Sequence, residues 1–439
     1  MRARGDAAIA SPVRIRDPIH GSITVTDDEK PIIDSRFFQR LRSVRQLGFG
    51  DLAFPGATHT RHAHSLGAMH VASRLFDAVA SRSTLTEASK ERFRAAVRLA
   101  VLCHDLGHMP LSHASESIAP QRSVLKLPAW TGDDSGQASH EDFTAKLLLD
   151  SSLTPILTKV YARHGITPEL IAGLVTGRLP AGVEGFRDGG LDWTPLLRAL
   201  VSGELDADRM DYLQRDSFYT GVNYGRYDIE WILQNLRCAE RDGRAVLALS
   251  KAAVFAFEDF LLSRYHMFLS VYYHHTSVSF DWMLKRYYEE APGEFEVPAD
   301  PDEFLWCDDV SLWTTLRKSK NRWAERIVSR KGFRRVAQFT ERDTDYDMSE
   351  ISKALDVAGV EHFTLESRGV LSRYTDEGET PSLFVHDSAS GRLTEVSAYT
   401  PLYQRFAGAV LLSRIFVRPD QVDIAKPLVA KLTGAHADE

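Results

Sequence analysis

The stretch HDLGHMPLSH at residues 104–113 decides the fold expected of this chain. It holds three histidines and one aspartate within ten residues, and Gly107 predicts a break in the helix that leads into it. Apolar residues recur upstream at spacings of three and four as far as His104, so His104 lies on the buried face of that helix. A buried imidazole costs free energy unless it is paired or coordinated. His104 therefore needs partners.

Two further segments bring polar side chains to apolar helix faces. The pattern over 66–79 predicts an amphipathic helix with His64 near its start, and a helical series over 197–212 places Asp208 on an inner face. A lone inward histidine is usually a hydrogen-bonded core residue. Here the candidates form a mixed nitrogen and oxygen set that suits zinc, iron or manganese: His64, His104, Asp105 and Asp208. Open positions on such an ion can take a water and a phosphoryl oxygen, so that the ion lowers the pKa of the water and polarises the phosphorus together.

The composition excludes several classes of protein. With 44% hydrophobic and 26% charged residues, the chain of 439 residues is expected to fold around a sizeable core. The net charge of -7 does not indicate a basic surface for nucleic acid, and three scattered cysteines exclude a disulfide framework. No apolar run is long enough to span a membrane, and the amino terminus lacks the apolar core of a signal peptide. We expect a cytoplasmic protein without a membrane partner.

The remaining patterns suggest where the domains divide. Residues 1–12 read as a flexible lead, residues 14–26 as an extended hairpin, and the apolar positions over 35–47 as a helix. The glycine-rich segment 177–195 is expected to be an exposed excursion. Prolines and acids around residue 295 mark a boundary. Beyond it, three short strand patterns, the last at 393–400, surround a helical one at 349–359, which predicts a small α+β lobe.

Several sequence motifs along the chain resemble those of one family. The order His64, His104-Asp105, Asp208 is that of the HD phosphohydrolase superfamily, whose metal ligands these positions match. The neighbouring words resemble the deoxynucleoside triphosphate triphosphohydrolases, especially the HD domain of the sterile-alpha-motif and HD-domain protein: DPIHG at 17–21, FQRLRSVRQLG at 38–48, FPGATHTRHAHSLG at 54–67, HDLGHMPLSH at 104–113 and LDADRMDYLQRD at 205–216. This resemblance implies a mainly α fold, with a helical HD phosphohydrolase core over 13–295 and an α+β lobe over 296–439.

The resemblance also implies the reaction and its catalytic residues. The expected products are a deoxynucleoside and inorganic triphosphate, formed by attack of water on the α-phosphorus. His113 matches a catalytic histidine, His140 a second one that protonates the leaving 5′ oxygen, and Glu116 stands where the family has a supporting aspartate. Without the resemblance, His113 would be a polar residue beside a helix, and His140 a first-turn residue after the Ser139 cap. A magnesium ion is expected to travel with the substrate triphosphate.

The same resemblance assigns substrate contacts and a regulatory site. The expected substrate contacts are Gln46, Leu47, Arg61, Tyr212, Asp216 and Tyr272, of which Arg61 would bind phosphate. Taken alone, Leu47 and the two tyrosines would be core packing, Arg61 a surface ion pair and Asp216 part of a solvated helix face. The family's allosteric guanine-nucleotide site between subunits matches Asp34, Gln39 and Arg42. We therefore expect activation by GTP or a dNTP in a homo-tetramer or other homo-oligomer. The plain interpretation of these three residues is an exposed helix face.

Two alternatives stay open. The first is an HD phosphohydrolase for a nucleoside monophosphate or a signalling nucleotide. Alarmone hydrolases usually continue HD with an acidic pair, whereas Leu106-Gly107-His108 follows here, and the sequence has no GYP segment of the kind found in cyclic dinucleotide hydrolases. The second is a non-catalytic nucleotide sensor, for which the complete ligand set together with His113 and His140 would be superfluous.

Overall fold

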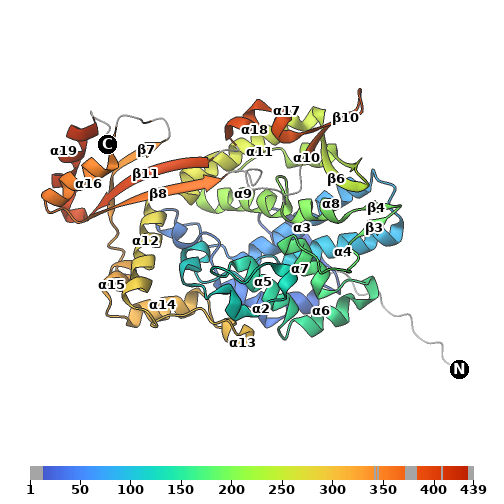
Figure 1. Ribbon diagram of the computed structural model, residues 1–439, viewed down its shortest axis with the longest axis horizontal. Helices are drawn as coiled ribbons and strands as arrows, with labels where there is room; N and C mark the ends of the chain where they lie inside the picture. Colours follow the sequence, from blue (N-terminus) through green and yellow to red (C-terminus); the bar gives the residue numbers. More distant parts are fainter. Residues whose placement is uncertain (1–12, 341–342, 344–345, 371–382, 407–408, 434–439) are drawn as a thin grey trace.

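The computed structural model of the chain describes residues 13–340, 343, 346–370, 383–406 and 409–433. The predicted flexible lead over residues 1–12 lies outside this range. Helices make up most of the described chain, and the longer strands gather in its C-terminal part (Figure 1). The predicted mainly α fold with an α+β lobe is confirmed. Among the described helices, none is both long enough and apolar enough to cross a bilayer.

The helical core is built around the neighbouring helices α3 and α4. Its helices are α3 (Arg61–Ala80), α4 (Glu87–Cys103), α5 (His140–Leu149), α6 (Thr154–Tyr161), α7 (Pro168–Thr176), α8 (Thr194–Val201), α9 (Ala207–Thr220), α10 (Ile229–Asn235) and α11 (Val254–Met267). Side-chain caps define the first residue of two of these helices. The Thr86 side chain caps α4, and Ser139 and Asp142 form a capping box at the start of α5.

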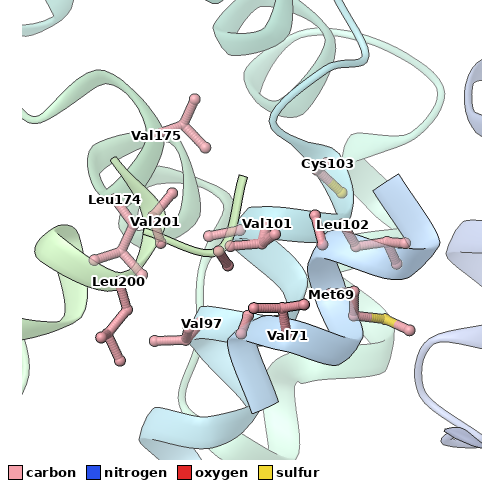
Figure 2. Packing of buried hydrophobic residues seen from close by; sticks show 14 of the residues in the cluster. Met69, Val71, Val97, Val101, Leu102, Cys103, Leu174, Val175, Leu200 and Val201 are labelled. Atoms are coloured by element: carbon pink, nitrogen blue, oxygen red, sulfur yellow. The ribbon is translucent and has the colours of Figure 1, made fainter. Parts of the chain in front are cut away.

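Aliphatic packing fixes the position of α4. Figure 2 shows buried side chains from α3, α4, α7 and α8 that belong to one hydrophobic cluster: Met69, Val71, Val97, Val101, Leu102, Leu174, Val175, Leu200 and Val201. Burying one such side chain stabilises the fold by roughly 1.5–3 kcal/mol. His104 follows Cys103 at the end of α4, so this layer also fixes the place of His104.

The N-terminal segment pairs as expected but its helix is shorter than expected. Strands β1 (Val13–Asp17) and β2 (Gly21–Val25) form the predicted hairpin, followed by α1 (Lys30–Ile33). The helix predicted over 35–47 ends early, because α2 (Arg36–Arg40) gives way to a 3-10 turn and Val44 is extended. Arg45 then forms a bridge with Thr60, and this pairing overrides the helical pattern.

Two further expectations were wrong in detail. The helical series over 197–212 is two helices, α8 and α9, and Asp208 lies in the first turn of α9. Asp206 caps α9 by accepting the backbone N–H of Arg209, which starts a new helix inside the apolar series. The segment 177–195 is not a simple exposed excursion. It buries Phe186 completely and contributes strands β3 (Arg187–Asp188) and β4 (Leu191–Asp192) to a sheet.

Most of the C-terminal part lies at one end of the molecule, but residues 392–406 lie beside α10 and α11 (Figure 1). Three elements precede residue 295: β5 (Leu236–Arg241), β6 (Arg244–Ser250) and α12 (His275–Glu290). The elements after it are α13 (Pro301–Phe304), α14 (Asp309–Lys318), α15 (Arg322–Val328), β7 (Arg334–Thr340), α16 (Met348–Val357), β8 (His362–Val370), β9 (Phe384–Asp387), β10 (Arg392–Glu395), α17 (Val396–Tyr399), α18 (Pro401–Phe406), β11 (Ala409–Val417) and α19 (Val422–Thr433). One sheet has the order β7-β11-β8 and packs against α16 and α19. The predicted strand at 393–400 is half correct, because β10 turns into α17.

Strand pairing crosses the predicted domain boundary near residue 295. Strands β9 and β10 return to the helical part and extend the sheet β10-β9-β6-β4-β3, in which β5 also pairs with β6. The pairing of β6 with β9 is parallel and joins Ala248 to Phe384. The boundary itself remains a prediction, but the two parts share a sheet.

Candidate active site

The structure brings the four predicted metal ligands together. His64 comes from the first turn of α3, His104 and Asp105 from the end of α4, and Asp208 from the first turn of α9. The Nε2 atom of His64 lies 3.0 Å from Oδ1 of Asp208, and the Nε2 atom of His104 lies 3.2 Å from Oδ1 of Asp105. Ligands held about 2.1 Å from one ion are separated by about 3.0–3.4 Å. The atoms are therefore spaced as neighbours around one divalent ion.

The hydrogen bonds of the His64 and His104 imidazoles leave the Nε2 atom of each ring free to bind a metal ion. Nδ1 of His64 donates to Asp211 Oδ2 at 2.8 Å, and Nδ1 of His104 donates to the backbone oxygen of Val101 at 2.6 Å. Each Nε2 atom therefore carries the lone pair, and both Nε2 atoms are buried without a hydrogen-bond partner. A buried acceptor without a donor is costly, and a cation satisfies both at once. The cluster thus fits a divalent metal on its own geometry.

The charges of the cluster support the same interpretation. Burial alone would lower the pKa of His64, but the adjacent carboxylates of Asp208 and Asp211 raise it to about 10. Burial would likewise raise the pKa of Asp105, yet Arg61 and His104 bring it well below its usual value. The carboxylates therefore stay ionised and attract positive charge, whether it comes from protons on the imidazoles or from a metal ion.

A second layer of residues, which the sequence did not reveal, orients His64. Asp211 accepts hydrogen bonds from His64, from Nε2 of His20 at 2.6 Å and from Nε of Arg215 at 2.8 Å. Arg215 also donates to Asp17 at 2.8 Å, so the β1 strand is tied to the site. The available signal was the position of Asp211 one helical turn after Asp208, on the same side of α9.

Arg61 lies inside the site and does not form the surface ion pair that would be expected of it without the family resemblance. It is only 5% exposed, its Nη1 donates to Asp105 Oδ2 at 2.7 Å, and its Nε donates to Ser112 Oγ at 3.0 Å. The guanidinium therefore joins a metal ligand to the 104–113 loop. It is placed where a phosphate bound at the cluster would meet it.

One carboxylate joins the predicted catalytic histidines. Glu116 Oε1 accepts from Nδ1 of His113 at 2.9 Å and from Nδ1 of His140 at 2.8 Å, so the longer arm of glutamate still reaches both. These hydrogen bonds hold the pKa of Glu116 far below its usual range, despite partial burial that raises it. His140 is also the first-turn residue after the Ser139 cap, so its plain and functional interpretations coexist. The arrangement can move protons between two imidazoles and a substrate.

His108 was missed as a site residue although it lies in the quoted stretch. Its ring stacks on His140 with 4.0 Å between centroids, and its Nε2 lies 3.3 Å from Asp105. Burial brings its pKa well below the usual value, so the ring is neutral and its Nδ1 is a buried acceptor without a partner. His108, His113, Glu116 and His140 also offer ligand atoms within 4.8 Å of one another. His108 therefore connects this group to the metal cluster.

The expected nucleoside contacts form a hydrogen-bonded group beside the cluster. Asp216 is buried and accepts from Tyr272 Oη at 2.9 Å and from Nε2 of His59 at 2.7 Å, which excludes the solvated helix face. Tyr212 and Tyr272 meet edge to face with centroids 6.0 Å apart. Gln46 is buried and its Oε1 has no partner, which leaves an acceptor for a ligand. Leu47 packs against the main core, as its plain interpretation had it.

A buried arginine without hydrogen bonds at two of its nitrogens was also missed. Arg264 of α11 is 5% exposed, and its Nε and Nη1 atoms have no partner. Burial and the nearby Arg209 lower its pKa. Arg209 itself is paired with Asp206, next to the metal ligand Asp208. A buried, unpaired guanidinium costs free energy, so a bound anion is the natural partner.

Family models match two segments of this chain. Residues 61–216 match the HD domain, and residues 227–370 match the HD associated region. The chain is an HD-domain protein. The HD segment begins at Arg61 and ends at Asp216, and it contains all four predicted metal ligands.

The relatives of this HD-domain protein are partly characterised. It is 31% identical over 339 residues to the uncharacterized protein MJ1154 of Methanocaldococcus jannaschii, covering 77% of this chain and 62% of that protein. It is 30% identical over 295 residues to the deoxynucleoside triphosphate triphosphohydrolase SAMHD1 of Homo sapiens, covering 64% of this chain and 45% of that protein. The chain thus spans about half of the length of these relatives. A solved hypothetical protein from Aquifex aeolicus has a TM-score of 0.72 at 28% identity and covers 95% of this chain and 100% of its own.

An arginine-lined cavity lies where the HD-associated region meets the N-terminal segment. The cavity has a volume of about 610 Å³, and its walls include Arg42, Arg45, Trp313, Arg317 and Arg330. Of the expected allosteric residues, Arg42 lines this cavity and donates through Nε to Gln39 Oε1 at 2.7 Å. Asp34 and Arg42 are exposed, which also fits their plain interpretation. A cluster of guanidinium groups beside an indole ring suits a phosphorylated, aromatic ligand.

Proposed function

We propose that this HD-domain protein hydrolyses deoxynucleoside triphosphates to the deoxynucleoside and inorganic triphosphate. The observation that carries the proposal is the buried His/Asp cluster, which has unsatisfied metal-ligating nitrogens and a nearby guanidinium that lacks an anion. The likeness to SAMHD1, a deoxynucleoside triphosphate triphosphohydrolase, supports the choice of substrate.

The residues around the cluster have different roles in the proposed reaction. His64, His104, Asp105 and Asp208 would hold iron, manganese or zinc, and such an ion polarises a phosphate and lowers the pKa of a bound water. Arg61 and Arg264 bind the negative oxygens of the triphosphate, and magnesium accompanies the triphosphate because it binds mainly phosphates and water. This arrangement directs the attack to the phosphorus nearest the cluster.

The histidines move protons at the other side of the reacting phosphorus. Glu116 accepts hydrogen bonds from both Nδ1 atoms, so each Nε2 atom faces away from the carboxylate. A His140 imidazolium then transfers its Nε2 proton to the departing 5′ oxygen, and His113 stabilises the attacked phosphate. Neutral His108 stacks on His140, faces Asp105 through Nε2, and keeps an Nδ1 acceptor without a partner.

The group around Asp216 selects the sugar. Asp216 has one oxygen on His59 and one on Tyr272, which sets the tyrosine ring beside Tyr212. A tyrosine ring packed against C2′ leaves no room for a 2′ hydroxyl. We therefore place deoxyribose before ribose among the substrates.

Regulation by a nucleotide is the second part of the proposal. The arginine-lined cavity would take the activating GTP or dNTP, with Arg42 binding phosphate and Gln39 and Asp34 nearby on the same segment. Because Asp34 and Arg42 are exposed, a second subunit can complete the site, which is consistent with the homo-tetramer or other homo-oligomer that we expect.

A product assay tests the proposal against its alternatives. Purified protein is incubated with each dNTP and rNTP, alone and in pairs, with manganese or magnesium, and inorganic triphosphate is measured. His104→Ala should abolish the reaction. Arg264→Gln should raise KM about tenfold or more, since a hydrogen bond to a charged group contributes about 1.5–3 kcal/mol, while Arg286→Gln on the surface of α12 serves as the matched control.

The products also separate the competing functions. Release of orthophosphate or pyrophosphate would place the attack elsewhere on the chain of phosphates and contradict the proposal. Turnover of a monophosphate or a signalling nucleotide alone would favour the other HD phosphohydrolases. Binding of dNTPs without any hydrolysis by metal-loaded protein would identify a sensor.

A further inference from the structure

The buried carboxylate of Asp309 joins parts of the chain that are far apart in sequence. Asp309 is the first residue of α14 in the HD-associated region, and it is only 6% exposed. Its Oδ2 accepts the backbone N–H of Arg45 at 3.0 Å, and its Oδ1 accepts the backbone N–H of Leu111 at 2.7 Å. Both oxygens are thus used to hold the backbone of two N-terminal segments.

The first of these segments positions Arg61. The backbone N–H of Arg61 donates to Val44 O at 2.9 Å, and that of Gln46 donates to His59 O at 3.1 Å. Arg45 stands between these two hydrogen bonds and pairs with Thr60. By holding the backbone of Arg45, Asp309 therefore also fixes the start of α3.

The second segment is the 104–113 loop in a conformation that needs support. Leu111 has a φ of 54° and Ser112 has a φ of 57°, a region that L-amino acids rarely adopt. Such backbone persists only where the surroundings hold it. The hydrogen bond from Leu111 N–H to Asp309 supplies one such hold, and Gly48 packs so close that a Cβ atom there would lie 2.9 Å from Leu111 O.

The two segments meet at Ser112. Its Oγ donates to Arg45 O at 2.7 Å and accepts from Arg61 Nε at 3.0 Å, and Arg61 in turn donates to Asp105. A continuous series of hydrogen bonds therefore leads from Asp309 to a residue of the metal cluster. His113, the next residue after Ser112, is carried by the same backbone.

We propose that Asp309 is a positioning residue, whose carboxylate sets Arg61 and the 104–113 loop in register across the metal cluster. The kinetic part of this inference rests on the proposed function. Burial raises the pKa of Asp309 to about 6, although two backbone N–H groups stabilise its charge.

The test compares Asp309→Asn with Asp308→Asn. Asparagine keeps the shape of Asp309 but replaces one acceptor by an NH2 group that faces a backbone N–H, so one hydrogen bond is lost. Asp308 caps α14 by accepting from Ser311 N–H, and asparagine caps equally well, which makes Asp308→Asn the matched control. We expect Asp309→Asn to lower kcat by about 10- to 100-fold, with KM within about threefold of the wild type. Metal content should be unchanged.

Hydrogen exchange gives a measurement that does not depend on activity. The amide of Leu111 should exchange faster in Asp309→Asn than in the wild type or in Asp308→Asn. Equal exchange in all three proteins would overturn the proposal, as would a wild-type kcat. A loss of kcat that matches a loss of metal would also overturn it, because Asp309 would then act on the cluster itself.

Two further results keep the proposal testable. If Asp309→Asn does not fold, Ser112→Ala removes the next hydrogen bonds in the series, and an unchanged kcat in that variant would overturn the proposal. If the wild type releases no triphosphate from any dNTP, the proposed function fails. The exchange of Leu111 then still decides whether Asp309 holds the loop.

Discussion

The metal cluster and the arginine-lined cavity both attract anions, but they are built in opposite ways. The arginines near the cluster, Arg61, Arg209, Arg215 and Arg264, are all buried. Three of them are paired with aspartates. In the cavity, Arg42, Arg317 and Arg330 are exposed, and Arg45 is half-buried and paired with Asp51. The first site is set before any ligand arrives, whereas the second must order flexible side chains when a ligand binds.

This difference has energetic consequences. Buried charges interact strongly and are hardly screened by salt, so removing one partner leaves an uncompensated charge. Exposed ion pairs contribute about 0–1 kcal/mol and weaken as salt is added. The cluster should therefore respond to single substitutions by large losses, and the cavity by small, salt-dependent ones.

The largest effect is expected from Asp208→Asn. Loss of a metal ligand should remove the metal and reduce dNTP hydrolysis by at least about a thousandfold, since a catalytic ion contributes several kcal/mol. Asp228→Asn is the control, because Asp228 caps α10 and asparagine caps as well. Metal content by mass spectrometry should be one ion per chain. Two ions would mean that the group around His108 binds a second one, and full activity without a metal would contradict the prediction.

A smaller loss is expected from Asp211→Asn, which leaves all four ligands in place. The substitution replaces one acceptor oxygen by an NH2 group and removes the charge that His64 faces, so the hydrogen bond that orients His64 is weakened and metal affinity should fall by about 10- to 100-fold. Competition with a chelator measures the affinity, and an excess of metal should restore activity. An unchanged affinity would show that His64 needs no orientation by Asp211.

The cavity should respond more weakly to Arg317→Ala. Binding of GTP, measured by titration in the Asp208→Asn background, should weaken about three- to fivefold, as expected for an exposed charge. Raising the salt from about 50 to about 300 mM should weaken GTP binding by the wild type further, without changing the metal content. Arg163→Ala is the control, because Arg163 is an exposed arginine that is far from Arg317 in the sequence. Salt-independent binding would contradict the contrast between the two sites.

The smallest effect is a pH-dependent loss of stability in Glu116→Gln. The folded pKa of Glu116 lies below its ordinary value of 4.5, so its contribution is complete above pH 4.5 and is lost as the pH falls through the folded pKa. The free energy of unfolding at pH 7 should drop by about 1 kcal/mol after solvent screening. Thermal unfolding at pH 7 and at about pH 3.5 should show this difference shrinking, with Glu87→Gln on the surface of α4 as control. A difference that does not depend on pH would contradict the prediction.

Much of the core of the site could be predicted from the sequence because its signals are local. His104 and Asp105 are neighbours at a helix end, and His64 lies in the first turn of another helix, so each side chain has a direction that spacing reveals. The cap at Ser139 likewise predicted the start of α5 before His140. Only the gathering of these residues needed the structure.

The remaining features depend on partners that are remote in sequence. Val44 leaves its helical pattern because Arg45 pairs with Thr60, and Phe186 is buried in a segment rich in turn residues because a sheet forms there. Arg264 sits in an ordinary aromatic helix, and nothing in the spacing shows that its guanidinium lacks a partner. Asp309 contacts Leu111 across 198 positions of the chain. Such contacts have no periodicity to detect.

The shared sheet has a consequence for how the chain can be divided. Strand β6 is covered along one side by β5, while β4 and β9 cover opposite ends of its other side. A protein cut at residue 295 would lose β9 and leave the backbone groups near Ala248 and Ser250 unpaired. Open strand edges recruit strands from other molecules. The protein cut at residue 295 should therefore self-associate and precipitate, although every ligand of its metal cluster would still be present.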